Sequence, residues 1–160
     1  MKRRDWILGL LALGLVGCGS SSNIVLDPVA RGERFSSVLY VEAATSAAME
    51  TELKDYFEDE LNDYLGERFA LGGRDSLTLR YRFVNFNEGN RFKRYLSVGV
   101  TNWGEGGLVV ETEFLDAEGN LLGKIVTDAN VEGTDLGGIQ KVFRRAAKKI
   151  SQFTIEHFSG

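Results

Sequence analysis

The chain has few residues whose side chains carry out covalent or metal chemistry. Its 160 residues include one cysteine, Cys18, and one histidine, His157. A zinc site of nitrogen and sulfur ligands needs several such residues, and a Ser-His-Asp type triad needs a histidine beside its nucleophile. His157 follows Phe153 by four positions at the end of an apolar helical stripe, so we assign it a structural role. The sequence therefore predicts no metal site of this type and no catalytic triad.

Glu111 and Glu113 are the candidates for acid–base chemistry. They alternate with apolar residues, so both point to the same side of a predicted strand, about two strand rises apart. Carboxylates about 5–9.5 Å apart hydrolyse glycosidic bonds. Arg80 and Arg82 alternate in the same way on another predicted strand, where they can face the two glutamates. We favour a surface lattice of opposite charges, and the alternative is a cell-wall glycan hydrolase.

Residues 116–120, Asp-Ala-Glu-Gly-Asn, supply oxygen atoms of the kind that Ca²⁺ prefers. The segment is too short and has too few ligands for an EF-hand loop. Its composition is typical of a β-hairpin turn, which is the structure we predict.

A further set of residues is suited to binding a partner. A tryptophan in the glycine-containing loop 102–107 is a candidate interface anchor, because large aromatic side chains often dominate binding. Basic residues on the helix-free side of the predicted sheet would form a strip that meets an acidic partner, peptidoglycan or lipid headgroups. The candidate partner-binding residues are Trp103, Arg91, Lys93, Arg94, Arg80 and Arg82.

The start of the chain has the layout of an export signal. Residues 2–4 are basic, and residues 6–17 form an apolar run that ends in Leu15-Val16-Gly17, directly before Cys18. A membrane-spanning helix needs about 17–25 mainly apolar residues, so this run predicts a signal peptide instead. The arrangement resembles the signal peptide and lipobox of bacterial lipoproteins.

That resemblance implies cleavage between Gly17 and Cys18 and a covalent diacylglycerol and N-acyl lipid on Cys18, with no other cofactor. In enteric lipoproteins an aspartate after the cysteine resembles an inner-membrane retention signal, and here the position holds Gly19. By this analogy we expect the protein at the outer membrane, anchored by lipid and facing the periplasm. A secretory signal without lipid, or a buried anchor, is the alternative.

Composition limits the remaining organisation. The formal net charge is −4, and removal of residues 1–17, which carry a net +2, would make it −6. Because nucleic-acid-binding proteins normally show a basic stripe, we expect no nucleic-acid partner. Residues 18–34 begin with Cys-Gly-Ser-Ser-Ser-Asn and hold the only proline, so we predict a lipidated N-terminus and flexible tether. Residues 35–160 are then a single periplasmic domain.

Hydrophobic periodicity predicts five strands, at 36–43, 77–84, 94–101, 108–115 and 121–131. A helix capped by Thr45 or Ser46 follows the first strand, and a second helix spans 136–158. The order β-α-β-β-β-β-α implies an α+β fold. We expect a two-layer sandwich with one mostly antiparallel five-stranded sheet and two helices on one face.

From residue 89 onward the chain resembles the lipoprotein family of domain of unknown function 4410 (DUF4410). The resemblance rests on Gly89-Asn90-Arg91, Arg94-Tyr95-Leu96, the glycine-rich residues 99–107, Gly119-Asn120-Leu121-Leu122, and Val131-Glu132-Gly133 before Gly137-Gly138. It implies no known catalytic residue.

We therefore expect a non-enzymatic binding or accessory module in cell-envelope assembly or maintenance. It would contact the membrane through its lipid and would bind an envelope protein or a cell-wall component, and self-association stays open. A small-ligand carrier is a further alternative, and it would need a pocket of about 300–1,000 Å³ between helices and sheet.

Overall fold

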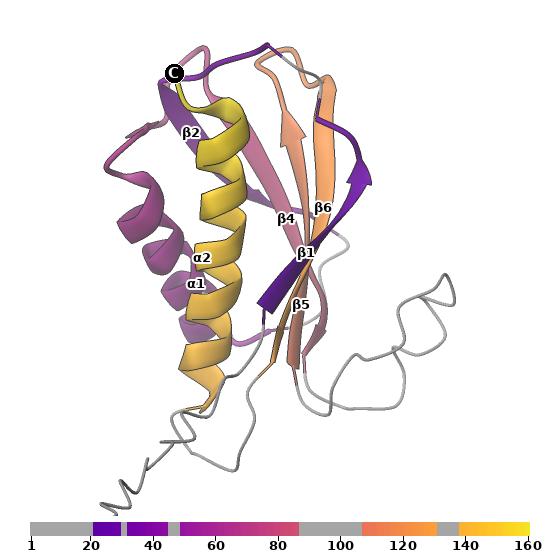
Figure 1. Ribbon diagram of the computed structural model, residues 1–160. Helices are drawn as coiled ribbons and strands as arrows, with labels where there is room; N and C mark the ends of the chain where they lie inside the picture. The colour runs from indigo at the N-terminus through magenta and orange to yellow at the C-terminus, as the bar shows by residue number, and fades with distance from the viewer. Residues whose placement is uncertain (1–20, 30–31, 45–48, 87–106, 131–137) are drawn as a thin grey trace, which may run out of the picture.

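Two helices cover one face of a six-stranded sheet in the computed structural model of the protein (Figure 1). The structure describes residues 21–29, 32–44, 49–86, 107–130 and 138–160. The sheet order is β1-β6-β5-β4-β2-β3, and the two-layer α+β fold predicted from the sequence is confirmed. In chain order the elements are β1 (Ser21–Asp27), β2 (Ser37–Glu42), α1 (Thr51–Leu65), β3 (Ala70–Leu71), β4 (Leu77–Phe86), β5 (Gly107–Leu115), β6 (Leu121–Asn130) and α2 (Gly138–Phe158).

The sheet differs from the prediction in its strand count and its pairing. Within the described residues it has six strands and is mixed, because β2 runs parallel to both β3 and β4, whereas β4, β5, β6 and β1 pair antiparallel. The parallel pairing follows from α1, which carries the chain back along the sheet so that β4 re-enters in the direction of β2. The predicted strand at 94–101 lies outside the described residues, and β4 pairs directly with β5.

The sequence predicts a flexible tether over residues 18–34, but Ser21–Asp27 of this segment form the strand β1, which pairs with β6. Asn23 explains why a polar segment joins the sheet. Its Oδ1 accepts a hydrogen bond from the Thr127 hydroxyl at 2.7 Å, and its Nδ2 donates to the carbonyl of Lys149 at 3.1 Å. One amide side chain thus fixes β1 to both β6 and α2, so residues 21–27 are part of the folded domain that the sequence analysis placed at 35–160.

The core lies between the helices and the sheet, and rings occupy its centre. Phe57 of α1 contacts Tyr81 and Phe83 of β4 at ring-centroid distances of 5.2 and 5.3 Å, and Phe143 of α2 at 6.4 Å. All four side chains are at most 2 % exposed. Edge-to-face contacts of this kind add to the free energy gained from burial alone.

The helices follow the periodicity predicted for them. In α2 the buried residues Val142, Phe143, Ala146, Ile150 and Phe153 recur at steps of three or four. The helix α1 begins at Thr51 after Glu50, which provides no side-chain cap, and the caps proposed at Thr45 or Ser46 lie outside the described residues. Both helices start at the same end of the sheet and run in the same direction (Figure 1). Neither α1 nor α2 is long and apolar enough to cross a membrane, in the part of the chain described.

Replacing Asn23 tests whether β1 is fixed by its side chain. Asn23→Ala would leave the fully buried Thr127 hydroxyl without its acceptor, so we expect a loss of about 1–3 kcal/mol in the free energy of unfolding. Urea denaturation of the chain from residue 18 measures this. Ser22→Ala, at an exposed position of the same strand, is the control and should change stability by less than about 0.5 kcal/mol. Equal stabilities for the two variants would contradict the assignment.

Candidate functional site

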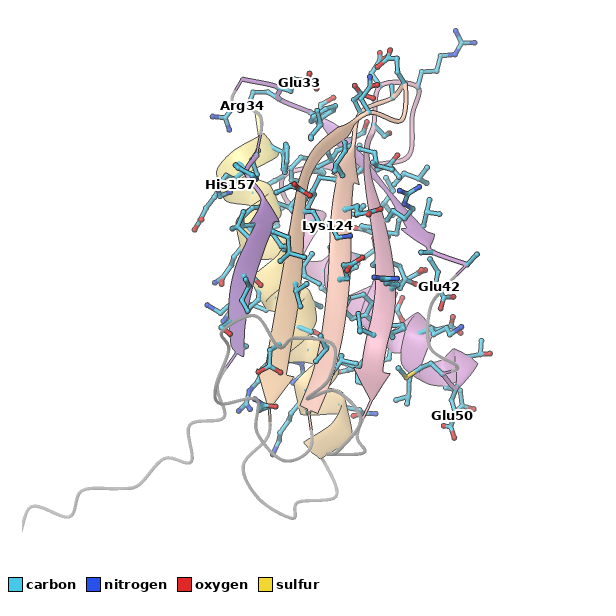
Figure 2. All side chains as sticks on the ribbon, turned by 90° about the vertical axis from the view of Figure 1, so that its right-hand side faces the viewer. Glu33, Arg34, Glu42, Glu50, Lys124 and His157 are labelled. Atoms are coloured by element: carbon cyan, nitrogen blue, oxygen red, sulfur yellow. The ribbon has the colours of Figure 1, made fainter. Side chains whose placement is uncertain are left out.

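The candidate site is a lattice of charges on the face of the sheet opposite the helices. Alternation along β4 and β5 sends Leu79, Tyr81 and Phe83 into the core and their neighbours to this other face. The strand register places Arg80 directly opposite Glu113 and Arg82 directly opposite Glu111. Figure 2 looks onto this face, with Lys124 near its centre.

Each glutamate of the lattice contacts two cations. Arg80 approaches Glu113 at 2.6 Å, and Arg82 binds both carboxylate oxygens of Glu111 at 2.8 and 2.9 Å. Lys124 of β6 bridges the pair, since its Nζ lies 2.9 Å from Glu111 and 3.2 Å from Glu113. The lattice of opposite charges predicted from the sequence is therefore present, with three positive and two negative groups.

Glu113 and Lys124 stabilise each other's charged forms. Burial alone would raise the pKa of Glu113, but hydrogen bonds and positive charge from Arg80 and Lys124 outweigh burial and hold that pKa below its usual value. Burial alone would lower the pKa of Lys124, but its bonds to Glu111 and Glu113 raise it. A general acid of a glycosidase needs the opposite shift, a raised carboxyl pKa, so Glu113 does not suit that role.

A shallow cleft of about 410 Å³ lies over the lattice. The end of β2 forms its other wall, from Val41 to the segment 43–44. Glu42 also borders the cleft and pairs with Lys54 of α1 at 3.0 Å. Val41 and its neighbour Leu39 are 39 % and 45 % exposed. The cleft thus combines a polar floor with an apolar rim.

A second cavity, of about 480 Å³, lies where β1 and the segment after it approach the C-terminal half of α2. Its apolar wall includes Val25, Val29 and Phe153, and its polar lining groups are Arg34, Glu156 and His157. The His157 ring stacks on Phe153 at a centroid distance of 4.1 Å, and its Nδ1 lies 2.9 Å from the Phe153 carbonyl oxygen. Figure 2 shows Arg34 and His157 at the same end of the molecule, beside β1.

The structure brings together only part of the predicted partner-binding set. Arg80 and Arg82 lie on the helix-free face, each beside a glutamate, so this part of the face is mixed in charge and not purely basic. Gly17 and Cys18, with Trp103, Arg91, Lys93 and Arg94, lie outside the described residues.

The hairpin predicted at 116–120 is confirmed. Asp116 Oδ1 accepts backbone N–H groups from Glu118 and Asn120 at 3.0 and 2.7 Å, so this carboxylate oxygen closes the turn. Gly119 has φ +87°, a conformation that suits glycine. Within the described ranges, no group of three or more His, Cys, Asp or Glu residues is arranged to hold a metal ion.

Sequence reasoning missed Lys124 and the cavity beside β1. Lys124 and Asp128 interrupt the apolar run of the last strand at a spacing of four, which places both on one face by the two-residue period. That signal identifies Lys124 as the third cation of the lattice. The cavity has no comparable signal, because the sequence predicts a tether at the position of β1.

Removing one carboxylate tests the electrostatics of the lattice. A group with a lowered pKa in the folded state stabilises the fold above its ordinary pKa, and this stability is lost as the pH falls through the lowered value. We expect the free energy of unfolding to fall more steeply between pH 5 and pH 3 in the wild type than in Glu113→Gln, which cannot ionise there. Glu67→Gln, at an exposed position, is the control and should keep the wild-type slope. Identical slopes in wild type and Glu113→Gln would refute this account.

Comparison with known proteins identifies similar structures and a family. The PelC dodecamer from Paraburkholderia phytofirmans is 12 % identical, with a TM-score of 0.49, over 83 % of this chain and 94 % of that chain. A minor lipoprotein from Acinetobacter baumannii is 14 % identical, with a TM-score of 0.44, over 79 % of this chain and 98 % of that chain. No relative matches among curated proteins. The family model described as domain of unknown function (DUF4410) matches residues 29–132, more than half of the sequence, and the chain belongs to this family.

Proposed function

We propose that this protein is a lipid-anchored, non-enzymatic binding or accessory module of the cell envelope. The observation that carries the proposal is the lone Cys18. It follows a basic segment and then an apolar segment, and the apolar segment ends in Leu15-Val16-Gly17 directly before it. Cleavage before Cys18 would leave a chain whose first strand begins three residues later, at Ser21. The anchor would then be attached almost directly to the sheet.

The energetics favour stable anchoring. One acyl chain of myristoyl length gives only marginal membrane binding, whereas a second chain makes it stable, at about 0.8 kcal/mol per buried methylene. A diacylglycerol and an N-acyl chain on Cys18 exceed that threshold. Because Gly19 replaces the aspartate of inner-membrane retention, we place the protein at the outer membrane, facing the periplasm. An envelope protein or a cell-wall component is the expected partner.

The ion pairs of the lattice support a binding role over catalysis. In the hydrolase hypothesis, one of Glu111 and Glu113 would have to hold a proton at neutral pH and donate it to a leaving group. Glu113 lies 2.6 Å from Arg80, Glu111 lies 2.8 Å from Arg82, and both share Lys124. Such an ion-paired surface is suited to contact with a polar partner, and the exposed Leu39 and Val41 beside it add apolar contact area.

A small-ligand carrier is the second candidate, favoured by the 480 Å³ cavity between β1 and α2. Its volume lies within the usual range of about 300–1,000 Å³ for ligand sites. Its apolar wall and its Arg34, Glu156 and His157 side chains suit an amphipathic molecule with a polar group.

Substitution of the anchor residue tests the leading proposal. In cells grown with labelled palmitate, the wild-type chain should incorporate label and fractionate with the outer membrane. Cys18→Ser should incorporate none and should keep its uncleaved signal, because the peptidase of this pathway acts after diacylation. Ser20→Cys in the Cys18→Ser background moves the thiol by two residues, and it is the control for the position of the thiol. Mass spectrometry showing an unmodified Cys18 in the wild type would remove the proposal.

Native mass spectrometry tests the carrier. The purified wild-type chain should retain a bound small molecule, and Val25→Trp, which places a large ring in the cavity from the exposed strand β1, should lose it. Leu121→Trp, at a similarly exposed site on the β6 hairpin, should retain it. A wild-type spectrum with the bare chain mass alone would reject the carrier hypothesis.

A further inference from the structure

The helix α2 has an unusual distribution of charge. Five basic residues occur within nine positions, and no acidic residue occurs from residue 138 to residue 155. They alternate with the buried residues of the helix, so they occupy the side turned away from the core. We name this side the α2 basic surface, which consists of Lys141, Arg144, Arg145, Lys148 and Lys149.

The fold uses only part of this charge. Arg144 pairs with Glu60 of α1 at 2.9 Å, and Arg145 donates to the carbonyl of Asn130 at 2.6 Å. No carboxylate of the described ranges forms an ion pair with Lys148 or Lys149. Lys141 lies near the start of α2, where the helix dipole disfavours a basic residue, and the first turn of α2 has no acidic residue. The stability of α2 therefore does not account for its basic surface.

The start of β1 lies beside this surface. Asn23 donates a hydrogen bond to the carbonyl of Lys149, which joins the second half of the basic surface to the beginning of the sheet. Cys18 precedes Ser21 by three residues, and a fully extended chain spans at most about 3.6 Å per residue. An anchor on Cys18 would therefore be joined to the start of β1 by a link of at most about 11 Å.

We propose that the α2 basic surface binds the anionic lipid headgroups of the membrane that holds the anchor; the proposal rests on the lipidation of Cys18 described above. The short link prevents the domain from moving far from the bilayer. Acidic side chains on the exposed side of α1, among them Glu52 and Asp59, would be repelled by the same headgroups. The opposite charges of the two helices thus select one orientation, with the β1 side of α2 toward the lipid.

The chain from residue 18 with Cys18→Ser lacks the anchor and contains every described element. Its binding to vesicles measures the lipid affinity of the α2 basic surface alone. We expect sedimentation with phosphatidylglycerol vesicles and none with phosphatidylcholine vesicles. Binding should fall as salt rises, since surface charges are screened beyond about 8–10 Å at 0.1–0.15 M. Equal binding to both kinds of vesicle, or binding to neither, would overturn the proposal.

Charge reversal locates the surface. Each basic residue changes membrane affinity about fivefold, so K148E/K149E should weaken binding to phosphatidylglycerol vesicles by roughly 25-fold or more. R68E/R74E changes net charge equally at two exposed residues that follow the C-terminal end of α1, at the other end of the helices, and should bind like the parent. Circular dichroism checks that each variant is folded, and Lys148→Gln provides a milder second variant with a loss of about fivefold. Equal loss in both double variants, or no loss in K148E/K149E, would overturn the proposal.

The vesicle experiments test the lipid-binding surface independently of the lipidation of Cys18. If Cys18 proves unmodified but the vesicle experiments give the expected differences, the anchor fails and the lipid-binding surface stands. If Cys18 is acylated but K148E/K149E binds like R68E/R74E, the anchor stands and the surface fails.

Discussion

The packing of Phe57 against three rings is the constraint on which the other features depend. Its side chain is 0 % exposed and contacts Tyr81 and Phe83 from the sheet and Phe143 from α2. One residue thereby holds α1, α2 and β4 together, and it keeps both helices on the same face of the sheet. Because the chain has a single cysteine, no disulfide supplements this core. The burial of aromatic and aliphatic side chains has to outweigh the entropy of folding by itself.

With both helices on one face, the opposite face must satisfy its side chains in another way. On β4, β5 and β6 it does so with alternating charges, in which Lys124 joins the pairs formed by Arg80 and Arg82 with the two glutamates. Exposed pairs of this kind contribute about 0–1 kcal/mol each. Their larger effect is on strand register, because a shift by one residue would send Arg80 and Arg82 into the aromatic core. The lattice thus contributes more to the choice of strand register than to the free energy of unfolding.

The sequence predicted the elements whose pattern is local and missed those that depend on distant partners. The 3.6-residue stripe of α2 and the alternation of β5 are visible within the elements themselves, so both were predicted to within a few residues. The strand β1 was missed because Ser21, Ser22 and Asn23 are poor strand formers, and their pairing depends on Thr127 and Lys149, more than 100 residues away. The parallel pairing of β2 with β4 was missed for a related reason. A helix between two strands favours parallel pairing only if the strands are neighbours in the sheet, and the sequence alone did not show that β2 and β4 are neighbours.

The segregation of charge between the helices also bears on function. Glu60 and Arg144 form an ion pair between α1 and α2, but Arg144 is exposed, and such a pair adds little to stability. Stability alone would be served equally well by mixed charges on both helices, which would also suit the dipole of α2 better. An acidic domain held within a few residues of an anionic bilayer is in a different situation. Its net charge is repelled, so a basic side is needed wherever the domain touches lipid. In the proposed arrangement, the position of β1 beside Lys149 would put that side next to the anchor, and the Asn23 side chain that joins β1 to the fold would also orient the domain at the membrane.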